Sequence, residues 1–179
     1  GSQAGATANG LTLNATFTDS ITVRGLAIGN FAGGSGIADT STDTFDTVAC
    51  NNLGTNASGT VAAPNLYGIS ILKSTSFANV IGGPSAATGL NLISGNLSQG
   101  IRVSGSGAKA TITNNYIGTN AAGTGAVANG VGIQLESEWP TLRPAASGTS
   151  ISRTAGFRST ATMSAAPEAG ADGAPGRGT

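Results

Sequence analysis

The sequence predicts an all-β fold in which short parallel strands are wound into a solenoid. Three observations predict it: a gapless internal repeat, a succession of short apolar segments with alternating polarity, and the lack of any amphipathic helical periodicity. The repeat decides the architecture, because self-similarity at a fixed spacing is the signature of stacked structural units.

The repeat relates residues 48–71, VACNNLGTNASGTVAAPNLYGISI, to residues 112–135, ITNNYIGTNAAGTGAVANGVGIQL, at an offset of 64 positions (118 − 54 = 64). The apolar positions keep their type in the pairs Val48/Ile112, Leu53/Ile117 and Ile71/Leu135. The identical positions are polar or glycine, with one isoleucine: Asn51/Asn115, Thr55/Thr119, Asn56/Asn120, Gly59/Gly123, Thr60/Thr124, Asn65/Asn129, Gly68/Gly132 and Ile69/Ile133.

Short apolar segments separated by Gly, Asn, Ser and Thr predict the strands. Alternation within them, as in Ile101-Arg102-Val103, places one set of side chains in the core and the other in solvent. β-Branched residues among Gly and Asn also disfavour helix. In chain order, we expect strands at residues 11–13, 21–23, 26–28, 36–38, 47–49, 67–72, 79–81, 90–93, 100–103, 110–112, 116–118 and 131–135.

Strands this short and frequent are also compatible with an antiparallel sandwich or barrel. The gapless repeat argues against that alternative, because it suits roughly three coils of about twenty residues in each unit. Coils wound in one sense stack their strands in parallel and bury inward residues against the next coil. We therefore expect a solenoid over residues 11–136, preceded by an N-terminal extension at residues 1–10.

Asparagines recur where the coils should turn. Asn and Gly tolerate the left-handed backbone conformation of tight corners, and stacked Asn side chains can form hydrogen-bonded ladders. The candidates for such ladder positions are Asn51, Asn96, Asn115 and Asn129. The alternative is that these are ordinary turn asparagines, which would change the account of stability but not the fold.

The composition excludes several kinds of partner. The chain of 179 residues has 8 basic and 8 acidic residues, no His and a single Cys, Cys50. A formal net charge of zero gives no electrostatic basis for binding nucleic acid, and the usual His and Cys ligands of zinc and haem sites are missing. No apolar run approaches the roughly 18 residues of a membrane span. We therefore expect no nucleic-acid partner, no membrane insertion and no cofactor.

Several segments follow one pattern: VRGLAIGNF (23–31), NVIGG (79–83), NLISGN (91–96), GIRVSGSGA (100–108) and NNYIGTNAAGT (114–124). They resemble the repeats of bacterial right-handed parallel β-helix proteins, which are large secreted or surface-attached proteins related in fold to pectate lyases. The resemblance covers about residues 22–136. It implies a right-handed parallel β-helix and an extracellular or cell-surface location. The usual Asp of the family's I-G-T-D segment is Asn56 and Asn120 here, so no cation role is carried over to these positions.

The pattern ends after Glu136. Residues 137–179 are rich in Ala, Gly, Ser, Pro and Arg and contain no Asn, a composition that cannot bury enough apolar surface to order itself. We expect a disordered tail with one weak strand or turn near residues 149–152. It is either a genuine linker or the product of out-of-frame translation of GC-rich repeat DNA. Because the chain begins without Met and enters patterned sequence almost at once, we interpret it as a piece of a longer protein.

The densest set of carboxylates is Asp39, Asp43 and Asp46. Carboxylate pairs carry out glycoside hydrolysis, and carboxylate oxygens bind Ca²⁺. The spacing D-x-x-x-D-x-x-D matches neither an EF-hand nor the glycine-rich Ca²⁺ nonapeptide, so we interpret the cluster as a solvated turn. We assign no catalytic, cofactor-binding or metal-binding residue.

Three further side chains could carry chemistry. Arg102 and Lys73 each lie on an otherwise neutral strand with no acid in the same coil, and we expect them only to aid solubility. Cys50 aligns with Asn114 of the second repeat and has no His to activate it. We expect a corner or core position for this cysteine rather than a nucleophile.

These observations predict a non-catalytic structural or surface-interaction module of an extracellular bacterial repeat protein, in contact with polysaccharide or cell-surface glycans. The alternative is a partial or degenerate polysaccharide lyase or glycoside hydrolase of the β-helix class. No amphipathic helix or charged cap is evident at Leu11 or Leu135, so we expect open end coils and end-to-end self-association.

Overall fold

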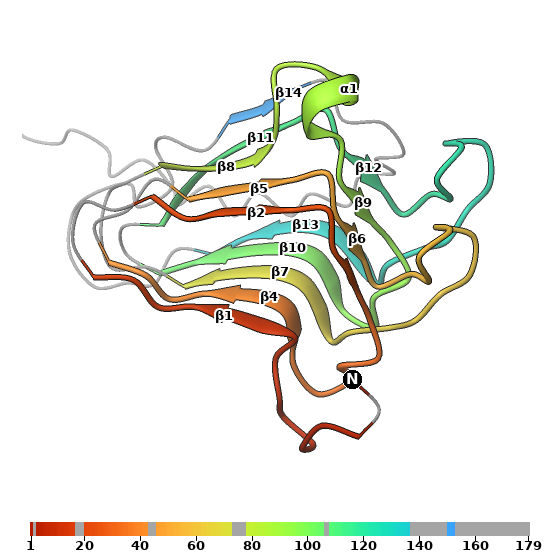
Figure 1. Ribbon diagram of the computed structural model, residues 1–179, viewed down its shortest axis with the longest axis horizontal. Helices are drawn as coiled ribbons and strands as arrows, with labels where there is room; N and C mark the ends of the chain where they lie inside the picture. The colour runs from red at the N-terminus through yellow and green to blue at the C-terminus, as the bar shows by residue number, and fades with distance from the viewer. Residues whose placement is uncertain are drawn as a thin grey trace, which may run out of the picture.

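A computed structural model of the chain describes residues 1, 3–16, 20–42, 46–72, 78–105, 108–136 and 150–152. Short strands in three parallel sheets dominate this structure (Figure 1). The all-β prediction is confirmed, and the parallel sheets are compatible with a β-solenoid.

The strands are grouped here as sheets A, B and C. Sheet A contains β1 (Leu11–Leu13), β4 (Ser35–Asp39), β7 (Tyr67–Leu72), β10 (Gln99–Ser104) and β13 (Val131–Leu135). Sheet B contains β2 (Thr22–Arg24), β5 (Thr47–Ala49), β8 (Ala78–Gly82), β11 (Lys109–Thr113) and β14 (Ser150–Ser152). Sheet C contains β3 (Ala27–Ile28), β6 (Asn52–Leu53), β9 (Leu92–Ile93) and β12 (Tyr116–Ile117).

The chain visits sheets A, B and C in turn, so three consecutive strands make one coil. The first coil is β1–β3, the second β4–β6, the third β7–β9 and the fourth β10–β12, while β13 and β14 belong to a fifth. A short helix, α1 (Ala86–Gly89), lies between β8 and β9 in the third coil (Figure 1). It was not expected, because four residues are too few to show a helical period.

The length of a coil corrects one expectation. Ile37, Ile69, Ile101 and Ile133 lie in one row of sheet A, so the second to fifth coils are 32 residues apart (69 − 37 = 32). The first coil is shorter, since Leu11 pairs with Ile37 (37 − 11 = 26). The 64-residue repeat therefore holds two coils, and the expectation of three coils of about twenty residues is wrong. The reason is that residues 54–65 and 118–129 form loops that add length to a coil without adding strands.

The core is a narrow column of aliphatic side chains. Each of the first four coils contributes inward residues from all three sheets, and the central isoleucines of sheet A are at most 4% exposed. Full burial of one such side chain contributes about 1.5–3 kcal/mol. The fully buried aliphatic residues, below 2% exposure, include Ile37, Leu53, Ile69, Ile71, Ile81, Leu92, Ile93, Ile101, Ile112 and Ile117.

The corner between sheets B and C holds a ladder of three buried asparagines, Asn51, Asn91 and Asn115, called the B–C ladder here. The Asn51 Nδ2 donates to Asn91 Oδ1 at 3.2 Å, and the Asn91 Nδ2 donates to Asn115 Oδ1 at 2.8 Å. Each Nδ2 also donates to a backbone carbonyl of the preceding coil, for example from Asn91 to Val48 at 2.8 Å. The side chains of Asn51 and Asn91 therefore each join their coil to both neighbouring coils, and that of Asn115 joins the fourth coil to the third.

A second ladder, the C–A ladder, consists of Asn65, Asn96 and Asn129 at the corner between sheets C and A. The Asn65 Nδ2 donates to Asn96 Oδ1 at 3.2 Å, and the Asn96 Nδ2 donates to Asn129 Oδ1 at 2.9 Å. The ladder interpretation of Asn51, Asn96, Asn115 and Asn129 is thus confirmed, and Asn65 and Asn91 complete the two sets.

Glycines pack against the C–A ladder at the start of the sheet A strands. A Cβ on Gly68 would lie 2.5 Å from the carbonyl oxygen of Gly100 and 2.6 Å from Ile93 Cγ2. A Cβ on Gly36 would lie 2.9 Å from the Asn65 Nδ2. Because the ladder amides fill this corner, there is room for glycine only.

The loops 54–65 and 118–129 project from the same side of the second and fourth coils (Figure 1). Each is closed by an antiparallel bridge, Thr55 to Ala62 in the first loop and Thr119 to Ala126 in the second. The backbone N–H of Ala121 donates to the carbonyl of Gly59 at 2.9 Å, so the two loops touch.

The two ends of the coil stack differ. At the N-terminal end, the Gly10 N–H donates to the Ser35 carbonyl at 2.9 Å and Asn9 Oδ1 accepts from the Ser35 N–H at 2.8 Å. These two bonds continue the pairing of β1 with β4 of the second coil, and the expectation of open end coils stays a prediction. At the other end, β14 confirms the weak strand expected near residues 149–152 by pairing with β11. The disorder expected for the rest of the tail concerns residues outside the described ranges.

Candidate functional site

The outer face of sheet A brings together side chains from three successive coils. The Arg102 Nη2 lies 2.6 Å from Glu136 Oε2, and its Nε donates to the same oxygen at 3.0 Å. The Arg102 Cζ also lies over the ring of Tyr67, 5.6 Å from the ring centroid, which is the geometry of a cation–π contact. The expectation that Arg102 is isolated is therefore wrong.

The coil length explains this arrangement. Arg102 and Glu136 are 34 residues apart in the sequence, close to the spacing of one coil, so Glu136 lies just beyond Arg102 on the next coil. The arginine in turn lies beside Ser70 of the preceding coil, in the strand that begins with Tyr67. Searching for an acid within one coil could not find this partner.

The Glu136 carboxyl has a lowered pKa. The hydrogen bond from Arg102 lowers the pKa of the Glu136 carboxyl below its ordinary value of 4.5 and outweighs the opposing effect of partial burial. Both side chains of the pair are about one-third exposed, at 29% and 30%. Glu136 is thus a carboxylate at neutral pH and accepts hydrogen bonds.

Two glutamines extend the same face. The Gln99 Nε2 donates to Gln134 Oε1 on the adjacent strand, and the Ser98 Oγ donates to Gln99 Oε1 at 2.7 Å. Gln134 lies directly beside Arg102 in the sheet register. The five partly exposed side chains Tyr67, Gln99, Arg102, Gln134 and Glu136 are called the sheet A polar face here.

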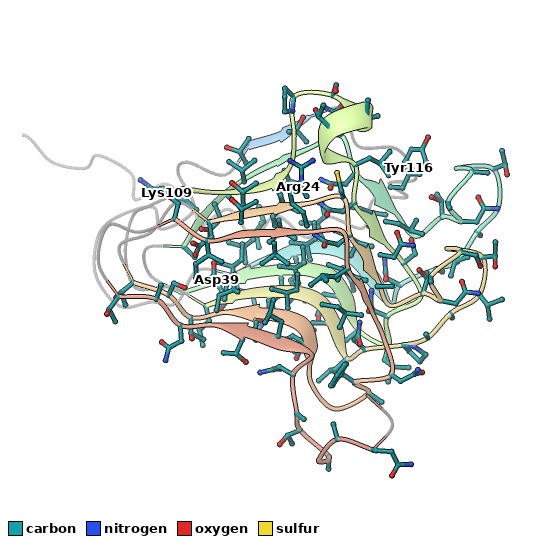
Figure 2. All side chains as sticks on the ribbon, viewed as in Figure 1. Arg24, Asp39, Lys109 and Tyr116 are labelled. Carbon is teal, nitrogen blue, oxygen red and sulfur yellow. The ribbon has the colours of Figure 1, made fainter. Side chains whose placement is uncertain are left out.

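The acidic cluster has a different role from the one expected. Asp39 and Asp46 are 3% and 1% exposed, so the interpretation as a solvated turn is wrong for both. Asp39 Oδ1 accepts from the Ser41 N–H at 3.0 Å, and Asp46 Oδ1 accepts from the Ile21 N–H at 2.9 Å. Figure 2 shows Asp39 at the end of its sheet A strand. These carboxylates satisfy backbone donors at the corner between sheets A and B.

Neither the cluster nor any other set of described residues makes a metal site. Within the described ranges, no group of three or more His, Cys, Asp or Glu side chains could hold a metal ion. Asp43 and Lys73 lie outside the described residues.

Cys50 occupies a corner, as expected from its alignment with Asn114. Its φ is 59°, and that of Asn114 is 53°, so both adopt the left-handed conformation that closes the turn after sheet B. The Arg24 Nη2 lies 3.3 Å from the Cys50 Sγ and donates to the Thr88 carbonyl at 2.9 Å. Figure 2 shows Arg24 beside this sulfur atom. The cysteine is thus part of the corner that α1 adjoins.

Comparisons of the chain with protein-family models, with curated proteins and with solved structures found no match. Among the described residues, no helix combines the length and the apolar character needed to cross a membrane. The interpretation of function therefore depends on the geometry of the sheet A polar face and of the coil corners.

Proposed function

We propose that this chain is part of a right-handed parallel β-helix that serves as a non-catalytic module of an extracellular bacterial repeat protein and contacts polysaccharides or cell-surface glycans. The observation that carries this proposal is the sheet A polar face. It combines an aromatic ring, a guanidinium–carboxylate pair and two amides on one sheet. Sugars offer planar arrays of hydroxyls and C–H groups, which suit charged donors and acceptors beside an aromatic ring.

The state of Glu136 supports binding rather than turnover. A general acid of a glycosidase needs a raised pKa so that it carries a proton at neutral pH. The pKa of Glu136 is lowered by Arg102, and its Oε2 already accepts two hydrogen bonds from that guanidinium. Such a carboxylate can accept from a sugar hydroxyl but is unsuited to protonating a leaving group.

The repeated residues support a scaffold role. What recurs between the two 64-residue units is chiefly corner glycines, ladder asparagines and inward aliphatic residues, and these join coil to coil. The right-handed sense of winding is supported by the resemblance to bacterial β-helix repeats and by the strong preference of parallel crossover connections for that hand.

Binding to immobilised neutral and acidic polysaccharides tests the proposal, with Arg102→Met as the test variant. This substitution keeps the aliphatic length but removes the guanidinium, so we expect binding at least tenfold weaker. Lys109→Met is the matched control, because Lys109 is a partly exposed cation on sheet B, away from the polar face.

Two outcomes would overturn the proposal. The first is an absence of binding to every polysaccharide, or equal retention of the wild type and Arg102→Met. The second is turnover of pectin or alginate by the chain, measured with and without Ca²⁺, which would establish the lyase or hydrolase alternative.

A further inference from the structure

The fifth coil lacks one of its three strands in the described part of the chain. β13 extends sheet A and β14 extends sheet B, whereas sheet C ends at β12. A depression of about 390 Å³ lies over this end of sheet C. It is lined by Ile117, by the loop 118–129 and by Gly132 of the fifth coil. Its position is that of the missing strand and of the turn that would follow it.

The equivalent place two coils earlier is filled. Gly54 corresponds to Gly118 in the repeat, and a Cβ on Gly54 would lie 2.2 Å from Asn96 Oδ1 and 2.4 Å from the Ser94 carbonyl oxygen. A Cβ on Gly118 would meet no atom nearer than 3.9 Å. The depression therefore has the position of a Ser-Gly-Asn turn such as residues 94–96.

The hydrogen-bonding groups match as well. Residues 91–96 dock on the second coil through the Leu92 N–H to the Asn51 carbonyl at 2.8 Å and the Ser94 N–H to the Leu53 carbonyl at 3.0 Å. The Asn96 Nδ2 adds a bond to the Leu53 carbonyl at 3.1 Å.

On the fourth coil the corresponding acceptors are the carbonyls of Asn115 and Ile117. No residue in the described ranges donates a hydrogen bond to either carbonyl. An edge with unpaired backbone acceptors is a template for a further parallel strand.

We propose that this edge and the depression beside it bind an extended segment of the type Asn-Leu-Ile-Ser-Gly-Asn, donated in trans by another repeat polypeptide. The segment adds a strand to sheet C beside β12, places its Ile in the core column and seats its Ser-Gly-Asn turn over Gly118. The lining is made of Gly, Ala, Thr, Asn and Ile side chains and carries no charge, so it suits an uncharged donor. The site continues the coil-to-coil interface of the solenoid and is independent of glycan binding.

The test uses the full 179-residue chain and a blocked peptide, acetyl-NLISGN-amide, a copy of residues 91–96. We expect saturable binding, seen as amide chemical-shift changes confined to residues 115–119 and 123–132. The matched peptide carries alanine in place of its glycine. Gly95 has a φ of +74°, and a Cβ there would lie 2.6 Å from the Gly54 carbonyl oxygen, so we expect at least tenfold weaker binding.

Two protein variants localise the site. Ala128→Trp fills the depression from an exposed lining residue and should abolish peptide binding. Ala57→Trp places the same side chain at an exposed position of loop 54–65, outside the depression, and should leave binding unchanged. Equal binding of the two peptides, shift changes elsewhere, or binding that survives Ala128→Trp would overturn the proposal, as would no binding at millimolar peptide.

Discussion

Truncation of Asn91 to alanine measures how strongly the B–C ladder holds neighbouring coils together. Asn91 is 0% exposed. Its Oδ1 accepts from the Asn51 backbone N–H at 3.0 Å and from the Asn51 Nδ2 at 3.2 Å. Its Nδ2 donates to the Val48 carbonyl and to Asn115 Oδ1, both at 2.8 Å. Asn91→Ala removes all four bonds from a site that water does not reach.

The expected loss follows from these contacts. A buried hydrogen bond contributes about 1 kcal/mol net, and a buried donor left unpaired costs about 1–3 kcal/mol. Four lost bonds and the unpaired backbone N–H of Asn51 together give a loss of about 5–7 kcal/mol in the free energy of unfolding. Since small proteins are stable by only about 5–15 kcal/mol, the variant should be close to unfolding at room temperature.

Urea denaturation followed by circular dichroism gives the measurement, with Asn56→Ala as the control. Asn56 Oδ1 accepts only within its own exposed loop, from the Thr60 and Val61 N–H groups at 2.9 and 3.2 Å. The same truncation should therefore cost about 1 kcal/mol there. With a slope of about 2 kcal/mol/M, Asn91→Ala should lower the midpoint by about 2 M or more. Equal midpoints for the two variants would refute the idea that the ladder holds the coils.

A charge variant at the same position gives a second readout. Asn91→Asp keeps the acceptor for the Asn51 N–H but places a carboxylate oxygen where the amide now donates to the Val48 carbonyl and Asn115 Oδ1. Burial and the facing oxygens raise the pKa of such a carboxyl in the folded state. Stability of the variant should therefore fall as pH rises above the unfolded-state Asp pKa of about 3.9. Stability that does not change relative to the wild type from about pH 4 upward would contradict the proposed geometry.

Three further substitutions test other features. Gly68→Ala should destabilise the folded protein by about 1–3 kcal/mol in thermal unfolding, because its Cβ would lie 2.5 Å from a carbonyl oxygen. In the control, Gly5→Ala, the added Cβ meets nothing within 4 Å, so the stability should not change. The lowered pKa of Glu136 contributes stability that is present above pH 4.5 and is lost as pH falls through the folded-state value. Glu136→Gln should therefore lower the free energy of unfolding by at most about 1 kcal/mol at neutral pH and weaken its dependence on pH below 4.5. An unchanged pH dependence in that range would argue against the pair with Arg102. Cys50→Gly should stabilise the folded protein by up to about 1 kcal/mol, since a φ of 59° is costly for a residue with a Cβ. Cys50→Val should destabilise it. The reverse order of melting temperatures would contradict this account.

Strand positions could be predicted because the apolar rows are visible locally. Each of the twelve predicted segments overlaps an observed strand, and Tyr67–Leu72 and Val131–Leu135 match to the residue. The two-residue strand Asn52–Leu53 was not among them, since a single apolar residue shows no alternation. The number of coils was wrong because loop length cannot be separated from coil length when only the repeat period is known.

The candidate site was less predictable, because its contacts cross coils. Arg102 could be related to Tyr67 and Glu136 only with the 32-residue spacing, which the sequence repeat hides by doubling it. Asp39 and Asp46 have the composition of a surface turn, and only the structure shows that they are buried acceptors. The asparagine ladders were easier to predict from the sequence, since the asparagines recur at corners marked by glycine.

The alternation of long and short connections also constrains how an array of this kind can evolve. Loops 54–65 and 118–129 lie two coils apart, while the third coil gains its extra length from α1 on another corner. Deleting 32 residues would preserve the isoleucine row of sheet A but bring two long loops onto adjacent coils, about 4.8 Å apart. Deleting or duplicating 64 residues keeps the loops in phase. Recombination within such a gene should therefore retain pairs of coils, and viable length variants should differ by whole two-coil units.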